Sequence, residues 1–144
     1  MRQILQNVSE AIDISSCRTK NILVVDDERD FRLSLGFALR RAGYIFTEAE
    51  NGKNALSIIL EAERKKIRFD LILLDMMMPE MSGSELIDAL QAEGIHIPTI
   101  IISAYTNRNT TEKLYMQGYR LFLEKPFKPE DILNMINDAL KETK

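Results

Sequence analysis

Residues 69–75 read Phe-Asp-Leu-Ile-Leu-Leu-Asp, a short apolar run that ends in the carboxylate of Asp75. Three other apolar runs are also followed, at once or within two residues, by a polar side chain. These side chains are Asp26 and Asp27 after residues 22–25, Ser103 after residues 99–102, and Lys125 after residues 121–123. Carboxylates bind hard metal ions, and hydroxyl and ammonium groups bind phosphate. The pattern therefore predicts a site of that kind at the ends of four strands.

From residue 21 onward, short apolar runs alternate with segments that have the spacing of an amphipathic helix. The runs cover residues 22–25, 44–49, 69–74, 97–102 and 119–123. Four of them are rich in Ile, Leu or Val, which is typical of strands buried on both faces. Helices are expected at about 31–42, 53–66, 84–93, 107–117 and 129–140. This alternation predicts an α/β fold, a parallel sheet covered by helices on both faces.

In such a sheet the carboxyl ends of the strands lie at one edge, where ligands bind. The residues that fall at this edge are Asp26, Asp27, Asp75, Ser103 and Lys125. Three carboxylates in one place require a compensating cation, and oxygen ligands without His or Cys favour Mg²⁺. Asp75 is suited to be the nucleophile of a phosphoryl transfer, because a carboxylate can form an acyl phosphate. Mg²⁺ and Lys125 would neutralise the phosphoryl oxygens, and Ser103 would donate a hydrogen bond.

Each of these residues has an ordinary alternative role when it is taken alone. Asp75 could belong to a turn, and Asp26 and Asp27 could cap the first helix. Lys125 could be a solvated lysine before a turn, and Ser103 a loop hydroxyl. The convergence of all five at one edge is what favours a phosphoryl-transfer site.

The length of 144 residues suits a single domain. The net charge of −3 argues against direct binding of nucleic acid, because phosphate backbones require a basic face. Cys17 is the only cysteine, so no intrachain disulfide can form. No stretch reaches the roughly 18 apolar residues of a membrane span, and residues 1–10 lack the apolar core of a secretory signal. We therefore expect a cytoplasmic protein without a membrane span and without direct nucleic-acid contacts.

Four short motifs, taken in order, are similar to those of one known family. They are Val24-Val25-Asp26-Asp27-Glu28, Asp75-Met76-Met77-Met78-Pro79-Glu80-Met81-Ser82-Gly83, Ser103-Ala104 and Lys125-Pro126-Phe127. Together they resemble the receiver domain of bacterial two-component response regulators, the CheY-like family. The resemblance implies a doubly wound, flavodoxin-like (βα)5 fold with a five-stranded parallel sheet in the order 2-1-3-4-5. We accordingly expect a receiver domain over residues 21–143 and an N-terminal extension or tail over residues 1–20.

The resemblance also implies roles for the residues that would hold the phosphoryl group and the metal. Asp75 matches the phosphoacceptor of the family. Asp26 and Asp27 match the acidic pair that holds Mg²⁺, to which Asp75 is a further ligand. The backbone carbonyl of Met77 would complete the protein ligands of the metal.

Three other positions match the residues that respond to phosphorylation in the family. Ser103 matches the switch hydroxyl, which moves toward the phosphoryl group, and Phe122 matches the switch aromatic, which rotates. Lys125 matches the phosphate-pairing lysine, and its peptide bond to Pro126 is cis in this family.

A receiver of this kind implies protein partners rather than a substrate of its own. It takes its phosphoryl group from a sensor histidine kinase or a phosphotransfer protein, and it signals to a downstream protein through altered surface contacts. It is not an enzyme beyond its own Mg²⁺-assisted phosphorylation and dephosphorylation.

Leu33 and Phe37 lie opposite the apolar stripe of the first helix, where we expect an exposed docking patch for the phosphate donor. Whether phosphorylation links two copies into a homodimer through the 107–140 face stays open.

Two other functions also stay open at this point. One is a scaffold that binds its partner regardless of phosphorylation. The other is a small Mg²⁺-dependent aspartyl-phosphate phosphatase, but such enzymes place a second Asp two residues after the nucleophile, where this chain has Met77. Met77 and Tyr105, each two residues beyond a site residue, are bulky and non-acidic. The resemblance implies that these positions tune hydrolysis, so we expect a slowly decaying phosphoryl group, and the alternative that both side chains merely pack stays open. Because the chain ends one helix after Lys125-Pro126, we expect a stand-alone receiver.

Overall fold

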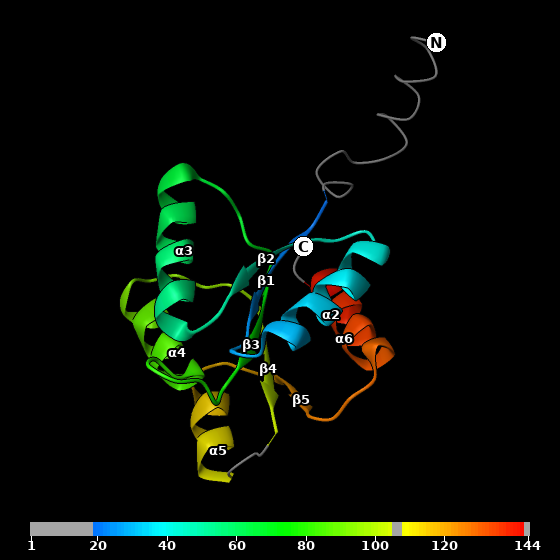
Figure 1. Cartoon of the computed structure of the whole chain (residues 1–144). Coiled ribbons are helices and arrows are strands. Elements are labelled where there is room, and N and C mark those ends of the chain that lie inside the picture. The colour runs from blue at the N-terminus through cyan, green and yellow to red at the C-terminus, as the bar shows by residue number, and fades with distance from the viewer. Residues whose placement is uncertain (1–18, 105–107, 143–144) are drawn as a thin grey trace.

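Five strands and five helices alternate along residues 19–104 and 108–142, the part of the chain that the structure describes (Figure 1). The structure is a computed structural model. The strands are β1 (Asn21–Val25), β2 (Ile45–Ala49), β3 (Leu71–Asp75), β4 (Thr99–Ser103) and β5 (Leu121–Glu124). The helices are α2 (Arg29–Arg41), α3 (Gly52–Lys65), α4 (Gly83–Ala92), α5 (Arg108–Met116) and α6 (Pro129–Glu142). None of the helices in these ranges is long and apolar enough to cross a membrane.

The strands form one parallel sheet in the order β2-β1-β3-β4-β5, so the expected fold class and strand order are confirmed. Helices α2 and α6 cover one face of the sheet, and α3, α4 and α5 cover the other (Figure 1). Successive side chains of a strand point to opposite faces. In β3, Leu71 and Leu73 enter the core beneath α2 and α6, whereas Ile72 and Leu74 enter the core beneath the other three helices. All four are at most 1% exposed, as expected for a strand covered on both faces.

Three strands begin two residues later than the apolar runs predicted. β3 begins at Leu71 rather than 69, β4 at Thr99 rather than 97, and β5 at Leu121 rather than 119. Pro98 has no N–H with which to pair along the sheet, and the N–H of Tyr119 instead closes α5 by donating to the Leu114 carbonyl at 3.0 Å. β5 is also an edge strand, so residues 121–123 are half-buried rather than enclosed on both faces.

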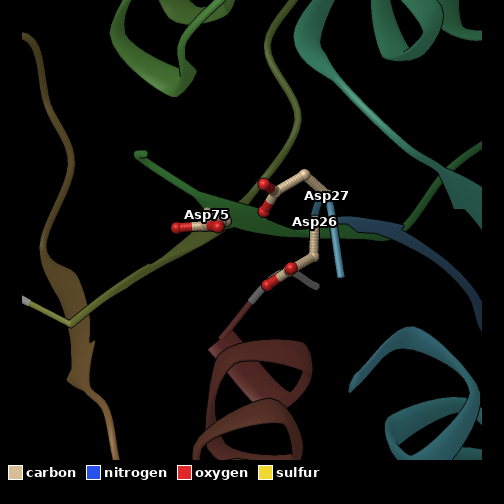
Figure 2. Close-up of side chains that lie close together, drawn as sticks. All are labelled: Asp26, Asp27 and Asp75. Atoms are coloured by element: carbon tan, nitrogen blue, oxygen red, sulfur yellow. The ribbon is translucent and has the colours of Figure 1, made fainter. Parts of the chain in front are cut away.

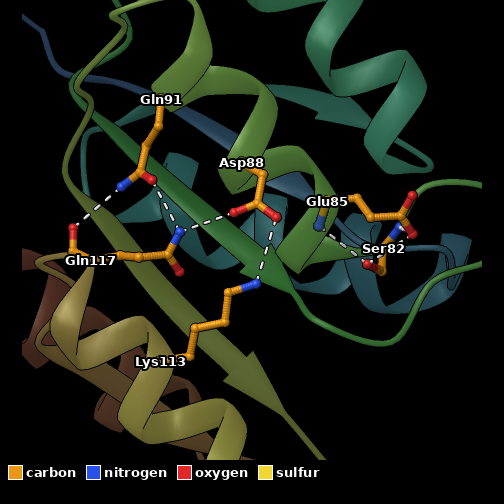
Figure 3. Close-up of polar contacts among 6 residues, drawn as sticks. All are labelled: Ser82, Glu85, Asp88, Gln91, Lys113 and Gln117. Carbon is orange, nitrogen blue, oxygen red and sulfur yellow. Dashed lines mark hydrogen bonds and ion pairs between the residues drawn. The ribbon is translucent and has the colours of Figure 1, made fainter.

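Helix α4 has a defined start and polar contacts with α5 (Figure 3). The Glu85 N–H donates to the Ser82 hydroxyl at 3.2 Å, and the Ser82 N–H donates to the Glu85 carboxylate at 3.4 Å, which is a capping box. Just past α5, Nε2 of Gln117 donates to the Asp88 carboxylate at 2.9 Å, and Lys113 lies 3.6 Å from the same group. These contacts hold α5 against α4, on the same face of the sheet.

Candidate functional site

Three carboxylates come together at the carboxyl edge of the sheet (Figure 2). Asp26 and Asp27 directly follow β1, and Asp75 is the last residue of β3. One oxygen of each carboxylate lies within 4.8 Å of the others. Asp26 and Asp75 are only 1% and 5% exposed, whereas Asp27 is exposed. The structure thus brings the three predicted residues into one negatively charged cluster, two members of which are shielded from water.

Every polar group of Asp26 has a hydrogen-bond partner. Its N–H donates to the Ala49 carbonyl at 3.1 Å, and its own carbonyl accepts Nη1 of Arg32 at 2.7 Å. In the side chain, Oδ1 accepts the Glu28 N–H at 2.8 Å and Oδ2 accepts Nζ of Lys125 at 3.0 Å. The N-cap of α2 is Glu28, so Asp26 does not have the capping role considered above. Both oxygens of the Asp26 carboxylate are therefore held by hydrogen bonds, and the carboxylate belongs to the cluster.

Burial raises the pKa of Asp75 from its ordinary value of 3.8 to about 6, and the charges of Asp26 and Asp27 act in the same direction. The Met77 N–H, which donates to Oδ1 of Asp75 at 3.1 Å, and the ammonium of Lys125 both lower this pKa but do not outweigh burial. A cation bound beside the carboxylate would favour its ionised form. We therefore expect the Asp75 carboxylate to ionise more readily when a cation is bound beside it.

Lys125 supplies part of that positive charge. Its Nζ lies 3.0 Å from Oδ2 of Asp26, 3.9 Å from Oδ2 of Asp75 and 4.4 Å from the centre of the Phe31 ring. Burial lowers the pKa of Lys125, but the hydrogen bond to Asp26 and the neighbouring carboxylates outweigh it, so the pKa is raised and the ammonium stays charged. The peptide bond to Pro126 is cis, as the resemblance implied. One ammonium offsets only part of the charge of three carboxylates.

Ser103 and Phe122 line the same cavity beside α5. Ser103 ends β4 and is 4% exposed; its neighbour Ile102 pairs in register with Asp75, so Ser103 lies one residue further along the edge. Phe122 is half-buried and packs against the core beneath α3, α4 and α5. The cavity has a volume of about 340 Å³ and is also lined by Met77. The hydroxyl and the aromatic ring thus border one space next to the cluster.

Several other residues singled out in the sequence lie on the surface or outside the described ranges. Leu33 and Phe37 are 44% and 67% exposed on α2, as their spacing predicted, and their docking role stays a prediction. The side chain of Met77 is 69% exposed, and its carbonyl as a metal ligand also stays a prediction. Tyr105 and residues 1–18 fall outside the described residues.

Two features next to the cluster were not predicted from the sequence. Arg32 is only 9% exposed despite its charge. It lies three residues before the buried Leu35 on α2, and a charged residue on a buried helix face is a signal that could have identified it. Gly83 is the first residue of α4 and lies against the end of β3, so a Cβ at this position would lie 2.7 Å from the Asp75 carbonyl oxygen. No local sequence pattern predicts this close contact between the backbones of Gly83 and Asp75.

The fold and the acidic cluster are those of a phosphorylation-controlled signalling domain, and the chain belongs to the response regulator receiver domain family, whose pattern matches residues 22–137. It is similar to the phosphate regulon transcriptional regulatory protein PhoB of Pseudomonas aeruginosa, with 36% identity over 126 residues that cover 86% of this chain and 53% of PhoB. It is also 32% identical to the hybrid signal transduction histidine kinase I of Dictyostelium discoideum. The match extends over 138 residues, which are 92% of this chain and 8% of that protein. The chain thus spans about half of one relative and a small part of the other.

Solved structures show the same fold. The receiver domain of the Francisella response regulator 1452 is 28% identical and superposes with a TM-score of 0.76, over 88% of this chain and 100% of that one.

Proposed function

We propose that this receiver domain accepts a phosphoryl group on Asp75 from a sensor histidine kinase or a phosphotransfer protein, in a reaction that requires Mg²⁺. The observation that carries the proposal is a buried carboxylate placed among two others and an ammonium, with Lys125 3.9 Å from Asp75 and the carboxylate oxygens within 4.8 Å of one another. Such surroundings suit phosphorylation of a carboxylate, because cations neutralise the charge that a phosphoryl group adds. The likeness to a response regulator and to a hybrid kinase supports these partners.

Asp26, Asp27 and Asp75, together with the backbone carbonyl of Met77, would hold the Mg²⁺. The donors are all oxygen atoms, the ligands that Mg²⁺ prefers, and the cluster keeps a negative charge after Lys125 is counted. When bound, Mg²⁺ would supply positive charge to the oxygens of the transferred phosphoryl group.

In the proposed transfer, an oxygen of Asp75 bonds to phosphorus while the bond from phosphorus to the donor histidine nitrogen breaks. Oδ1 of Asp75 already accepts the Met77 N–H at 3.1 Å, whereas Oδ2 faces Lys125, so we assign the attack to Oδ2. The donor nitrogen keeps the electron pair of the broken bond and takes a proton from water. Lys125 would then pair with the phosphoryl oxygens, and the Ser103 hydroxyl would donate to one of them.

The signal would leave the domain through Ser103 and Phe122. Both border the 340 Å³ cavity beside α5, which gives them room to move. On the outer side of α5, Tyr115 and Met116 are 53% and 88% exposed. A downstream protein, or a second copy in a phosphorylation-linked homodimer, would read the altered surface there.

Simpler features support the proposed domain organisation and location of the protein. The proposed receiver domain covers residues 21–143, which the start of β1 at Asn21 supports, and residues 1–20 are proposed as an N-terminal extension or tail. The lone Cys17 supports a cytoplasmic location, and the net charge of −3 supports the absence of direct nucleic-acid contacts. Apart from its own phosphorylation and dephosphorylation, no catalysis is part of the proposal.

Incubation with Mg²⁺ and acetyl phosphate is expected to add one phosphoryl group to the wild-type protein, measured as intact mass after a rapid quench. The Asp75→Asn variant and the wild type in EDTA should show no adduct. An adduct on Asp75→Asn would place the phosphoryl group elsewhere. Absence of an adduct on the wild type would favour a scaffold that binds its partner without phosphorylation.

The combined change Leu33→Ser and Phe37→Ser is expected to slow phosphoryl transfer from a histidine phosphotransfer protein by about tenfold, because exposed apolar side chains are frequent anchors of protein contacts. Uptake from acetyl phosphate should be unchanged, since both residues lie outside the acidic cluster. Ile45→Ser is a matched control, because Ile45 is also apolar and 52% exposed but lies on β2. Equal loss with both donors, or no loss with the protein donor, would reject the docking role.

A further inference from the structure

Arg32 ties α2 to the ends of two strands beside the acidic cluster. It lies in the first part of α2 and is 9% exposed. Its Nη1 donates to the backbone carbonyl of Asp26 at 2.7 Å in a buried hydrogen bond, and its Nε donates to Oε1 of Glu48 in β2 at 3.0 Å. Burial of a guanidinium is costly unless its donors are satisfied. One of these bonds goes to Asp26, a member of the cluster, and the other goes to Glu48 in β2.

The carbonyl that Arg32 holds belongs to the peptide group between Asp26 and Asp27. Because a peptide group is planar and rigid, the direction of this carbonyl also sets the direction in which the chain leaves Asp26 and enters Asp27. The carboxylate of Asp26 has its own partners, the Glu28 N–H and Lys125, but these act on the side chain. Loss of the Arg32 bond would release the peptide that orients both acidic residues.

The pair with Glu48 makes this arrangement compatible with a site for a cation. The guanidinium of Arg32 and the carboxylate of Glu48 form an ion pair at 3.0 Å, with side-chain exposures of 11% and 37%. Glu48 therefore offsets the charge of Arg32, which can hold the Asp26 peptide without supplying an uncompensated positive charge to the cluster.

We infer that Arg32 is a positioning residue for Mg²⁺, which holds Asp26 and Asp27 in the orientation that the metal requires. The inference rests on the proposed function, because it concerns the same acidic site. Partners that orient the ligands of a metal typically change its affinity by about 10- to 100-fold when they are removed.

A role of Arg32 as a charge and a role as a positioning residue predict opposite effects of Arg32→Met on the affinity for Mg²⁺, so the two roles can be distinguished. If Arg32 acted only as a nearby positive charge, the change Arg32→Met would strengthen Mg²⁺ binding, because it removes a charge that repels the metal. If Arg32 positions the ligands, the same change weakens Mg²⁺ binding. A purely structural role would lower the stability of the fold and leave the affinity of the folded protein unchanged.

The test is the dissociation constant for Mg²⁺, measured on the full chain by competition with Mn²⁺ followed by electron paramagnetic resonance. We expect Arg32→Met to weaken Mg²⁺ binding by about tenfold. Arg32→Lys, which keeps the charge but offers a single donor group, should be intermediate. Arg40→Met is the matched control, since Arg40 lies on the same helix, is exposed and stacks on Phe46 at 5.3 Å, and it should stay within about twofold of the wild type.

Urea unfolding in EDTA, measured alongside, shows the fraction of each variant that is folded. Unchanged or tighter Mg²⁺ binding by Arg32→Met, while the wild type binds Mg²⁺ and takes up phosphoryl groups, would overturn this inference alone. Absence of Mg²⁺ binding by the wild type would overturn it together with the metal part of the proposed function. If Arg32→Met does not fold, Arg32→Lys decides the matter, and an affinity equal to that of the wild type would reject the positioning role.

Discussion

Replacement of Asp75 by asparagine is expected to stabilise the metal-free protein at neutral pH by on the order of 2 kcal/mol, while it abolishes phosphoryl uptake. Asparagine keeps an acceptor for the Met77 N–H and removes a charge that burial disfavours. The difference in the pKa of Asp75 between 3.8 and about 6 corresponds to about 3 kcal/mol by itself. The attraction between Asp75 and the Lys125 ammonium, 3.9 Å away, opposes the effect of burial and is already included in this difference, so the expected gain is of the same order.

The pH dependence of this gain has a defined direction. Because the pKa of Asp75 is higher in the folded than in the unfolded chain, the folded state binds the Asp75 proton more tightly between about pH 4 and pH 6. The wild type therefore loses stability from this group as the pH rises through that window, and Asp75→Asn does not. The difference in free energy of unfolding between the two proteins should be small below about pH 4 and reach its full size above about pH 6.

Urea unfolding of both proteins in EDTA, at a series of pH values across this window, measures the difference directly. The other titrating groups are common to the two proteins and cancel in the comparison. Saturating Mg²⁺ should narrow the difference at neutral pH, because a ligand that binds the folded wild type stabilises it. If Asp75→Asn proves no more stable than the wild type at neutral pH in EDTA, burial does not disfavour the Asp75 charge as inferred.

A methyl group added at Gly83 is expected to destabilise the fold by about 3 kcal/mol. An ideal Cβ at this position would lie 2.7 Å from the carbonyl oxygen of Asp75 and 2.9 Å from the Cα of Met76. Both are backbone atoms, so they cannot rotate away as the end of a side chain could. Alanine has a better helix propensity than glycine by about 1 kcal/mol, but the clash outweighs this gain. Either α4 or the end of β3 must shift.

The free energies of unfolding of Gly83→Ala and Ser84→Ala provide the comparison. Ser84 is the next residue of α4 and already carries a Cβ, so Ser84→Ala should change the stability by no more than about 0.5 kcal/mol. Gly83→Ala should also weaken Mg²⁺ binding, because a shift of β3 would move Asp75. A Gly83→Ala protein as stable as Ser84→Ala would mean that α4 can retreat from the strand at little cost.

Much of the fold follows from local patterns in the sequence. The alternation of apolar runs with helix-spaced segments predicted the five strands, the five helices and the parallel sheet, because periodicity depends only on neighbouring residues. The ends of the runs placed Asp26 and Asp75 at one edge of the sheet. The strand order was implied by the resemblance rather than by periodicity, and the structure agrees with it. The starts of β4 and β5 were predicted too early, because Pro98 and Tyr119 are apolar or aromatic but cannot extend the strands.

Local patterns in the chain therefore established the fold class and the chemical groups of the site. How those groups pair depends on the folded structure. Lys125 lies closer to Asp26, at 3.0 Å, than to Asp75, at 3.9 Å, and Arg32 holds the Asp26 carbonyl, although no local pattern indicates either contact. Lys125 and Asp26 are 99 positions apart, and the distance between such residues is set by strand register and helix packing rather than by their neighbours in the chain. The pKa of Asp75 depends on these distances and on burial, which exist only in the folded chain.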